Sequence, residues 1–157
     1  MKQNWINQIP PKVGYYIAGF VDGEGSFNVS VKKCKDRRLG WKVEPLFNVS
    51  QKDKVILALL KRWLKCGKIR QRKDGIFYYE VRNINALQNN VIPFFEKFSF
   101  LSSKTKKNFS IFRKIVKKIV QGEHLKEEGL KEILKLRERL NEGRGRKRKY
   151  TFDDVIN

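Results

Sequence analysis

Two acidic residues, Asp22 and Glu24, lie in a short glycine-containing segment, Ile17-Ala18-Gly19-Phe20-Val21-Asp22-Gly23-Glu24-Gly25. The apolar run 13–22 predicts a buried helix, and the glycines that follow it are typical of a helix end. The helix dipole disfavours negative charge at a C-terminus by ~0.3–1 kcal/mol. A divalent cation would neutralise such carboxylates better than lysine side chains would. The residue types therefore indicate a metal site at the end of this helix.

The spacing of the small residues suggests a helix contact. Gly19 and Gly23 are four residues apart and Ala18 lies beside them, so one face of the predicted helix carries almost no side chain. Such a face allows two helices to approach closely. Two copies of the helix packed there would bring two Glu24 carboxylates together, and their repulsion would favour a metal ion. The alternative is purely structural, because glycine-rich helix ends with an acidic residue are common.

The charge of the chain points to a polyanionic partner. The 157 residues include 36 Lys and Arg but 16 Asp and Glu, a net charge of +20, while 40% are hydrophobic. That composition supports a packed core, and nucleic acid is the commonest polyanion. A single histidine, His124, argues against histidine-dependent catalysis. Two isolated cysteines, Cys34 and Cys66, do not suggest a disulfide framework or a zinc site.

The sequence also predicts where the protein is found. It has no run of 18 apolar residues, so we expect no membrane span and no membrane partner. The N-terminal residues lack the apolar core of a signal peptide. We therefore expect an intracellular protein that is not secreted, in bacterial or archaeal cytoplasm or in an organelle.

The hydrophobic periodicity predicts an α+β fold. Two segments that alternate apolar and polar residues, 27–31 and 41–50, read as a hairpin, and 68–72 with 76–82 read as a second. Helical spacing appears between the hairpins at 54–65, with Asp53 as its cap, and again at 103–120 and 126–141. We expect an irregular arm at residues 1–12, a helix broken near Pro93, and a capping box at Thr151–Asp154. Both hairpins would pack an apolar face on helices and leave a polar face free.

That polar face carries residue types that read base edges and phosphates. Arg70 and Arg72 suit guanine, and Asn28 and Asn48 suit adenine. The sheet residues that we expect to contact bases or phosphates are Asn28, Ser30, Lys32, Lys42, Glu44, Asn48, Arg70, Arg72, Tyr78 and Glu80. The residues that we expect to contact the sugar-phosphate backbone are Lys106, Lys107, Arg113, Arg146 and Lys147. The alternative is that exposed strand and helix faces are polar in any protein.

The segment IAGFVDGEG resembles the signature of the LAGLIDADG homing endonucleases. Three further blocks resemble that family in the same order: FNVSQKD at 47–53, GKI at 67–69, and LSSK at 101–104 followed by Phe109 and Phe112. The resemblance implies an αββαββα core with a four-stranded antiparallel DNA-binding saddle backed by helices. We assign this core domain to residues 13–121, and a C-terminal helical extension with a basic tail to 122–157.

The resemblance also implies roles for single residues. Glu24 would bind the metal, Mg²⁺ or else Mn²⁺ or Ca²⁺, with help from the Gly23 carbonyl. Gln51 would order solvent around the attacked phosphate, and Lys104 would polarise that solvent or stabilise the developing charge. Ala18, Gly19, Asp22 and Gly23 would belong to the dimer helix, Asp22 in a structural role. The family often has a basic residue where this chain has Val55, which is a departure from the pattern.

The expected function follows from these roles. The sequence has one copy of the motif, and family members with one copy act as homodimers. We therefore expect a Mg²⁺-dependent, homodimeric DNA endonuclease that cuts a long pseudo-palindromic site in intron homing. Two alternatives stay open: an RNA maturase that assists splicing of its host intron, and a catalytically decayed DNA-binding protein. A maturase would bind intron RNA and tolerate Glu24→Gln.

Overall fold

The computed structural model describes residues 4–142 and 148–157. Contacts divide the chain into two compact units: unit 1 comprises Met1–Ser26 and Phe47–Lys106, and unit 2 comprises Phe27–Leu46 and Lys107–Asn157. Both units draw on separate stretches of sequence, so neither matches the division at residue 121, which stays a prediction.

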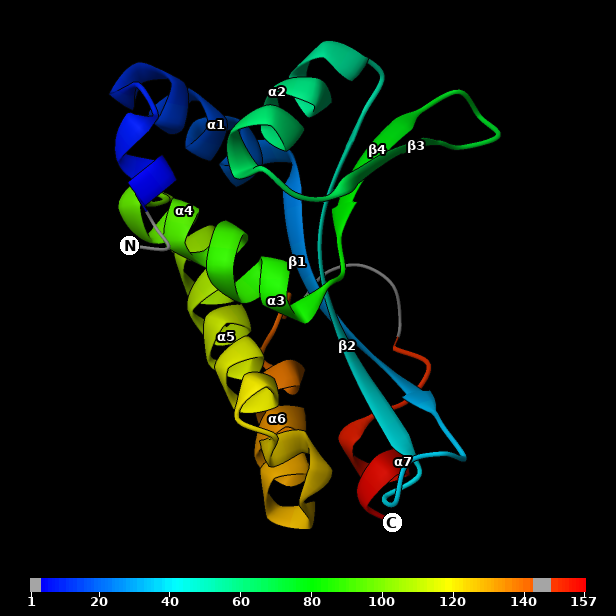
Figure 1. The fold of residues 1–157 in the computed structure, drawn as a ribbon. Helices are drawn as coiled ribbons and strands as arrows, with labels where there is room; N and C mark the ends of the chain where they lie inside the picture. The colour runs from blue at the N-terminus through cyan, green and yellow to red at the C-terminus, as the bar shows by residue number, and fades with distance from the viewer. Residues whose placement is uncertain (1–3, 143–147) are drawn as a thin grey trace. The chain divides into compact units, whose positions relative to one another are not determined.

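The described elements have the expected α+β order (Figure 1). In sequence they are η1 (Asn4–Gln8), α1 (Pro11–Glu24), β1 (Gly25–Lys33), β2 (Trp41–Gln51), α2 (Lys54–Leu64), β3 (Lys68–Gln71), β4 (Phe77–Val81), α3 (Ile84–Ala86), η2 (Leu87–Val91), α4 (Ile92–Lys97), α5 (Ser103–Val120), η3 (Glu123–Leu125), α6 (Glu127–Glu138) and α7 (Phe152–Ile156). The strands form one four-stranded antiparallel sheet in the order β1-β2-β4-β3. The predicted sheet is confirmed.

In unit 1, α2 and the β3–β4 hairpin share a core. Asp53 caps α2 as predicted, its Oδ1 accepting the Val55 amide at 2.9 Å. The fully buried Tyr79 donates its hydroxyl to the Cys66 carbonyl at 2.7 Å. A Cβ on Gly67, whose φ is +91°, would lie 2.5 Å from the Tyr79 ring. Glycine is therefore required at this turn, which aligns β3 with β4.

The N-terminal residues differ from the predicted arm. Residues 4–8 form the turn η1, and Ile6 and Ile9 are buried. Helix α1 begins at Pro11, whereas we expected the helix to begin at Val13. The pair Pro10–Pro11 could end a preceding segment, but proline also suits the first turn of a helix, where its missing N–H has no partner to lose.

The predicted break near Pro93 takes a defined form. Residues 87–91 form a turn of π-helix directly before the proline-containing helix α4. Proline cannot donate a hydrogen bond to the preceding turn, and a π-turn is one way for a helix to absorb that loss. Side chains from this stretch nevertheless pack inward, because Leu87, Val91 and Phe94 are fully buried.

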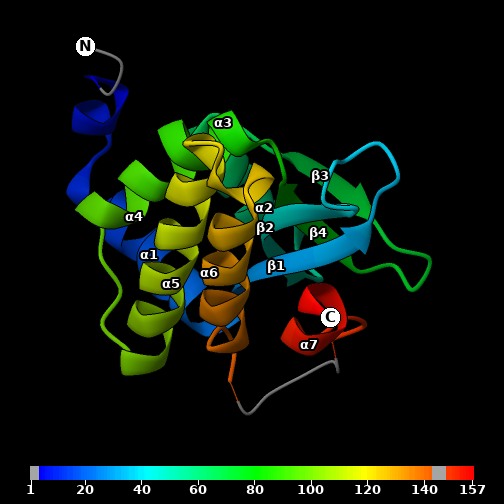
Figure 2. The same ribbon diagram turned by 90° about the horizontal axis from the view of Figure 1, so that it is seen from below.

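In unit 2, α5 and α6 lie side by side (Figure 2), and side chains near the end of α6 bind the backbone of β1. Arg137, which is 4% exposed, donates from Nε to the Val29 carbonyl at 2.8 Å. Asn141 donates from Nδ2 to the Phe27 carbonyl at the same distance. Burial lowers the pKa of Arg137, and the nearby Arg148 adds to that effect.

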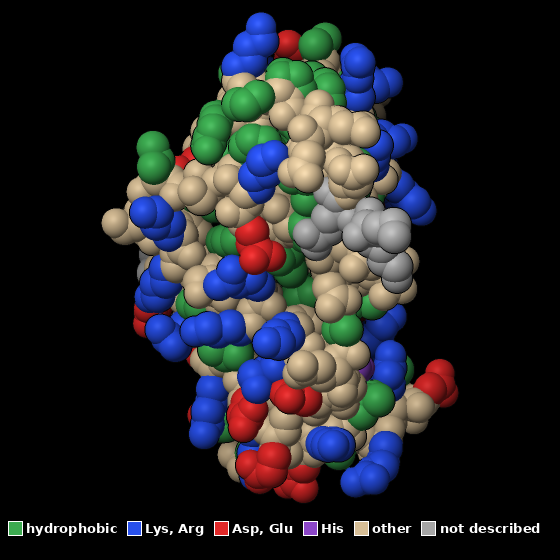
Figure 3. Space-filling model, turned by 60° about the vertical axis from the view of Figure 1, so that its left-hand side comes forward, with side chains coloured by type: hydrophobic (Ala, Val, Ile, Leu, Met, Phe, Trp, Pro, Cys, Tyr) green, Lys and Arg blue, Asp and Glu red, His purple; other side chains and the backbone are tan. Residues whose placement is uncertain are grey.

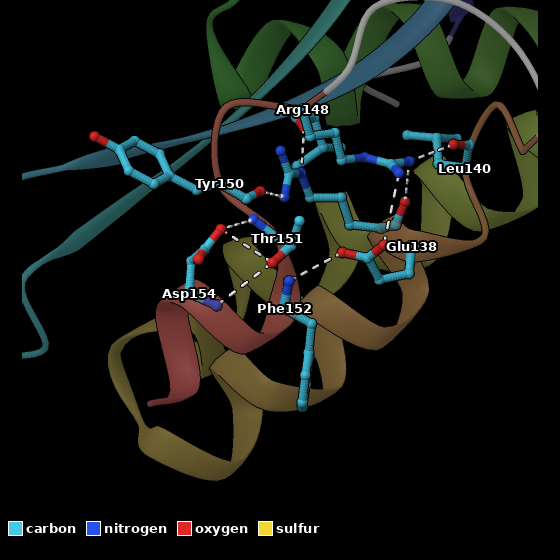
Figure 4. A network of polar contacts seen from close by, with 9 residues as sticks. Glu138, Leu140, Arg148, Tyr150, Thr151, Phe152 and Asp154 are labelled. Carbon is cyan, nitrogen blue, oxygen red and sulfur yellow. Dashed lines mark hydrogen bonds and ion pairs between the residues drawn. The ribbon is translucent and has the colours of Figure 1, made fainter.

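A polar network holds the C-terminal segment on α6 (Figure 4). Arg148 donates to the carbonyls of Arg137 at 2.7 Å and Leu140 at 2.6 Å. The predicted capping box is present, because Thr151 and Asp154 bond each other reciprocally at the start of α7. Arg148 thus has a structural role within the basic tail, while the predicted DNA contacts Arg146 and Lys147 lie outside the described residues.

Candidate metal centre and nucleic-acid interface

Glu24 is the last residue of α1, and both it and Gly23 are exposed. A Cβ built at Gly19 or Gly23 meets no atom within 4 Å, so both positions lie on an open face of the helix. Ala18 does not share that face, since it is 3% exposed and packs within the chain. The open small-residue face therefore consists of the two glycines, because the helical turn directs residue 18 to the core side.

Asp22 fixes the end of α1 against the start of α5. Its carboxylate accepts hydrogen bonds from the Ser102 hydroxyl, the Ser102 amide at 3.1 Å and the Leu101 amide at 3.3 Å. The Thr105 hydroxyl donates to the Asp22 carbonyl at 3.3 Å. Burial alone would raise the pKa of Asp22, but hydrogen bonds from Ser102, Thr105 and Leu101 outweigh burial and lower it. The Asp22 carboxylate is thus engaged within the chain.

Lys104 is exposed in the first turn of α5, two residues beyond Ser102. The contacts of Asp22 therefore bring the element that carries Lys104 to the end of the helix that carries Glu24. Lys104 and Glu24 are both open to solvent.

Gln51 is the last residue of β2, and β1 begins directly after Glu24. Because these neighbouring strands are antiparallel, both residues lie at the same end of the sheet. The Gln51 side chain is half-buried, and its Oε1 accepts the Lys52 amide at 3.0 Å. Val55 is 74% exposed in the first turn of α2 and offers no polar group there.

The donors at the end of α1 suit a hard divalent cation. Glu24 supplies a carboxylate at a helix C-terminus, where backbone carbonyls already carry partial negative charge. Mg²⁺ commonly takes one or two carboxylates together with substrate phosphates. Within residues 4–142 and 148–157, no three His, Cys, Asp or Glu side chains gather closely enough to hold a metal. The residues present therefore fit Mg²⁺ as part of a donor set that one chain does not complete.

The sheet carries two clusters that we call the Glu44 cluster and the Glu80 cluster. In unit 2, Glu44 binds Lys32 through Oε2 and Lys42 through Oε1, both at 3.0 Å. Burial alone would raise the pKa of Glu44, but the two lysines outweigh it and lower the pKa.

In unit 1, Glu80 binds Arg70 through Oε1 at 3.3 Å and Arg82 through Oε2 at 3.1 Å. Glu80 was expected on the free polar face, but the residue is only 8% exposed. Arg70 and Arg82 flank its carboxylate, and each remains about half exposed. The alternation of the strand was interpreted correctly, but it does not reveal cover by neighbouring cations.

Other predicted contact residues have partners within their own unit. Arg72 pairs with Asp74 at 3.1 Å in the β3–β4 turn. The Asn28 Oδ1 atom accepts from Asn141 at 3.2 Å. Asn48 and Tyr78 lie in the paired strands β2 and β4, Asn48 opposite Glu80. The Ser30 hydroxyl donates to the Glu44 carbonyl at 3.4 Å.

The residues of α5 that we expect to contact the DNA backbone differ in their surroundings. Lys107 pairs with Glu142 at 2.8 Å, and the Arg113 guanidinium lies 5.9 Å from the centre of the Phe109 ring. Lys106 is exposed. Figure 3 shows Lys and Arg side chains spread over much of one face, with fewer Asp and Glu. No helix in the described ranges is long and apolar enough to cross a membrane.

Sequence reasoning left three kinds of residue out of the candidate site. Arg82 shares the Glu80 cluster and could have been found from its alternation with Glu80 on the same strand face. Ser102 and Thr105 anchor Asp22, and the motif LSSK was the available signal. Arg137 had no signal, because nothing in an amphipathic helix marks which arginine will be buried.

Comparison with known proteins decides the family. The model for the LAGLIDADG endonuclease family matches residues 17–116, which include the second part of α1, the sheet and most of α5. The chain belongs to the LAGLIDADG endonuclease family. The family resemblance and the α+β fold predicted from the sequence are both confirmed.

Relatives in the family share both sequence and fold with this chain. A probable intron-encoded endonuclease 2 of Neurospora crassa is 34% identical over 145 residues, covering 90% of this chain and 32% of that protein. The homing endonuclease I-ApeII of Aeropyrum pernix is 31% identical, covering 64% of this chain and 60% of its own length. The chain thus spans less than two thirds of the length of either relative.

Solved structures of family members match over a larger share of their length. The archaeal intron-encoded homing endonuclease I-Vdi141I, solved with DNA, is 36% identical with a TM-score of 0.83, over 92% of both chains. The homing endonuclease I-TnaI is 33% identical with a TM-score of 0.78, over 87% of this chain and 90% of its own.

Proposed function

We propose that this LAGLIDADG protein is a site-specific DNA endonuclease of intron homing. It would cut both strands of a long pseudo-palindromic site as a homodimer with Mg²⁺. The observation that carries the proposal is the exposed Glu24 at an open helix end, anchored through Asp22 to the helix that bears Lys104. The relative I-Vdi141I, solved with DNA, supports a DNA substrate.

Glu24 and the Gly23 carbonyl would hold the metal, which lowers the pKa of an attacking water and stabilises charge on the phosphate. Lys104 is exposed in the first turn of α5, and its ammonium would stabilise the negative charge that develops on the phosphate oxygens. Gln51 can orient a water molecule once its carboxamide turns from the Lys52 amide, since its side chain offers both donors and an acceptor.

The homodimer is supported by the open face of α1. Gly19 and Gly23 leave room for a second helix, and Tyr15 and Tyr16 on the same helix are 58% and 59% exposed. Two copies related by a two-fold axis would place two Glu24 carboxylates near each other. That arrangement would complete the donor set that a single chain leaves partial, and it implies a pseudo-palindromic target.

The test is cleavage of DNA that spans the insertion junction of the host intron with the intron removed. Wild-type protein is incubated with Mg²⁺ or EDTA beside Glu24→Gln and the control Glu128→Gln, whose carboxylate is exposed on α6. We expect a discrete double-strand cut that requires both Mg²⁺ and Glu24 and persists in the control. DNA that is bound but never cut would contradict the nuclease, and splicing of intron RNA would then test the maturase alternative.

A further inference from the structure

In the Glu80 cluster, one buried carboxylate binds two arginines in the absence of DNA. Glu80 is 8% exposed in the strand β4, and Lys68 of β3 and Asn48 of β2 lie opposite it. Each of its two oxygens binds a different arginine, Arg70 or Arg82. One carboxylate therefore fixes two cations on the polar face of the sheet.

The atoms used in these contacts matter for recognition. Both arginines approach Glu80 through Nε, at 3.3 Å for Arg70 and 3.1 Å for Arg82. Paired hydrogen bonds to O6 and N7 of guanine are made mainly by the terminal Nη atoms, so an Nε contact with a carboxylate is compatible with them. The arginine side chains are 54% and 52% exposed, whereas the Glu80 side chain is 10% exposed. The carboxylate thus lies beneath two guanidinium groups that remain accessible.

We propose that Glu80 is a positioning residue for sequence discrimination, which holds Arg70 and Arg82 in place for base contacts and lowers the attraction of this face to arbitrary DNA. This inference rests on the proposed function. Ordering two long side chains in advance removes much of the entropy cost that specific binding would otherwise carry. A fixed negative charge between them also weakens contacts with phosphates, which carry no sequence information.

The Glu44 cluster supports this reading, because the same arrangement recurs independently in unit 2. There one carboxylate oxygen binds Lys32 and the other binds Lys42. The Glu44 side chain is 20% exposed, against 62% and 47% for the two lysines. Lysine lacks the planar fork of arginine, so we assign the discriminating role to the Glu80 cluster.

The test compares three variants with wild type by equilibrium binding in EDTA, where binding is measured without cleavage. Glu80→Gln removes the charge, and Glu80→Asp keeps the charge but shortens the side chain so that it cannot span both arginines. Glu128→Gln is the charge-matched control on α6, where the Glu128 side chain is 84% exposed and lies 3.7 Å from Lys131. The probes are the junction duplex and a duplex of the same composition with scrambled order, over a range of salt concentrations.

We expect Glu80→Gln to lower the ratio of target to scrambled affinity about tenfold, partly through tighter binding of the scrambled duplex. Its dependence on salt should steepen, by ~0.9 log unit per log salt for each added phosphate contact. Glu80→Asp should lower the ratio without steepening the salt dependence. If Glu80→Gln is unfolded at the assay temperature, the comparison of Glu80→Asp with wild type decides the test. Glu128→Gln should keep the ratio.

Two results would overturn the proposal, and they differ from failure of the proposed function. A Glu80→Gln or Glu80→Asp protein that is folded and keeps the wild-type ratio shows that Glu80 does not act in discrimination. An equal loss in Glu128→Gln shows that charge alone is responsible. Wild-type protein that binds both duplexes equally would instead contradict site-specific recognition itself, and the role of Glu80 with it.

Discussion

The Ser102 hydroxyl donates a hydrogen bond to the Asp22 carboxylate, which joins the end of α1 to the start of α5 across 80 residues of chain. This contact joins the helix that ends with Glu24, which we propose as a metal ligand, to the helix that carries Lys104. An exposed site of two flexible side chains thereby gains a fixed support.

We predict that Asp22→Asn destabilises the protein by about 1–2 kcal/mol, because it weakens hydrogen bonds to a charged acceptor. The pKa of Asp22 is lowered below 3.8 in the folded state, so its contribution is full above about pH 5 and is lost as the pH falls through the folded value. Wild type and variant should therefore converge in stability at low pH. Chemical denaturation at several pH values measures the free energy of unfolding, with Asp36→Asn, a change at an exposed residue, as the control. A difference in the free energy of unfolding between Asp22→Asn and wild type that stays constant with pH would refute the pKa argument.

We predict that Gly19→Leu folds as a single chain but fails to self-associate or cleave. A Cβ at residue 19 meets no atom within 4 Å inside the chain, so a larger side chain there would clash only with a second copy packed on this face. Gly14→Ala is the contrasting variant, because its Cβ would lie 2.3 Å from the Phe98 ring and should destabilise folding. Sedimentation and thermal melting separate the two effects, and unchanged self-association of Gly19→Leu would exclude this face as the interface.

We predict that Lys104→Met lowers the cleavage rate about 100-fold while binding changes little, as expected for a group that acts mainly on developing charge. Lys106→Met, two residues further along α5, should leave the rate on bound DNA unchanged. It should weaken binding of all duplexes and reduce the salt slope by ~0.9 if that lysine contacts a phosphate. Single-turnover cleavage and salt-dependent binding distinguish the two lysines, and equal behaviour of both variants would count against a catalytic Lys104.

We predict that Arg137→Met destabilises the protein by about 2–3 kcal/mol, because the Val29 and Tyr150 carbonyls lose a charged donor at 2.8 Å. The exposed neighbour Arg139→Met should stay within about 0.5 kcal/mol of wild type. Urea denaturation measures both. If Arg137→Met changes the free energy of unfolding by less than about 0.5 kcal/mol, water molecules replace the hydrogen bonds that Arg137 makes to the two carbonyls at no cost in stability.

Local patterns were sufficient to predict most elements. The alternation in 27–31 and 41–50 gave the buried faces of β1 and β2, and Asp53 and Thr151 were identified as caps from sequence alone. These features depend on neighbours within a few residues, which is what periodicity and capping rules describe. The start of α1 was missed because a proline pair is compatible with both a stop and a first helical turn.

The support of the candidate site was not predictable in the same way. The partners of Asp22 lie 80 residues away, and the buried Glu80 binds two arginines, Arg70 and Arg82. Periodicity carries no information on such distant pairings. The family resemblance supplied Glu24, Gln51 and Lys104 as a set, whereas the residue pattern alone indicated only a carboxylate at a helix end.

The bonds from Arg137 and Asn141 to the carbonyls of β1 have a consequence for aggregation. β1 is one of the two edge strands of the sheet, so a foreign strand could extend the sheet at this edge by hydrogen bonding to the outer side of β1. The Val29 and Phe27 carbonyls are already taken by side chains at the end of α6. Addition of a foreign strand, and the aggregation that follows from it, is therefore disfavoured at the β1 edge.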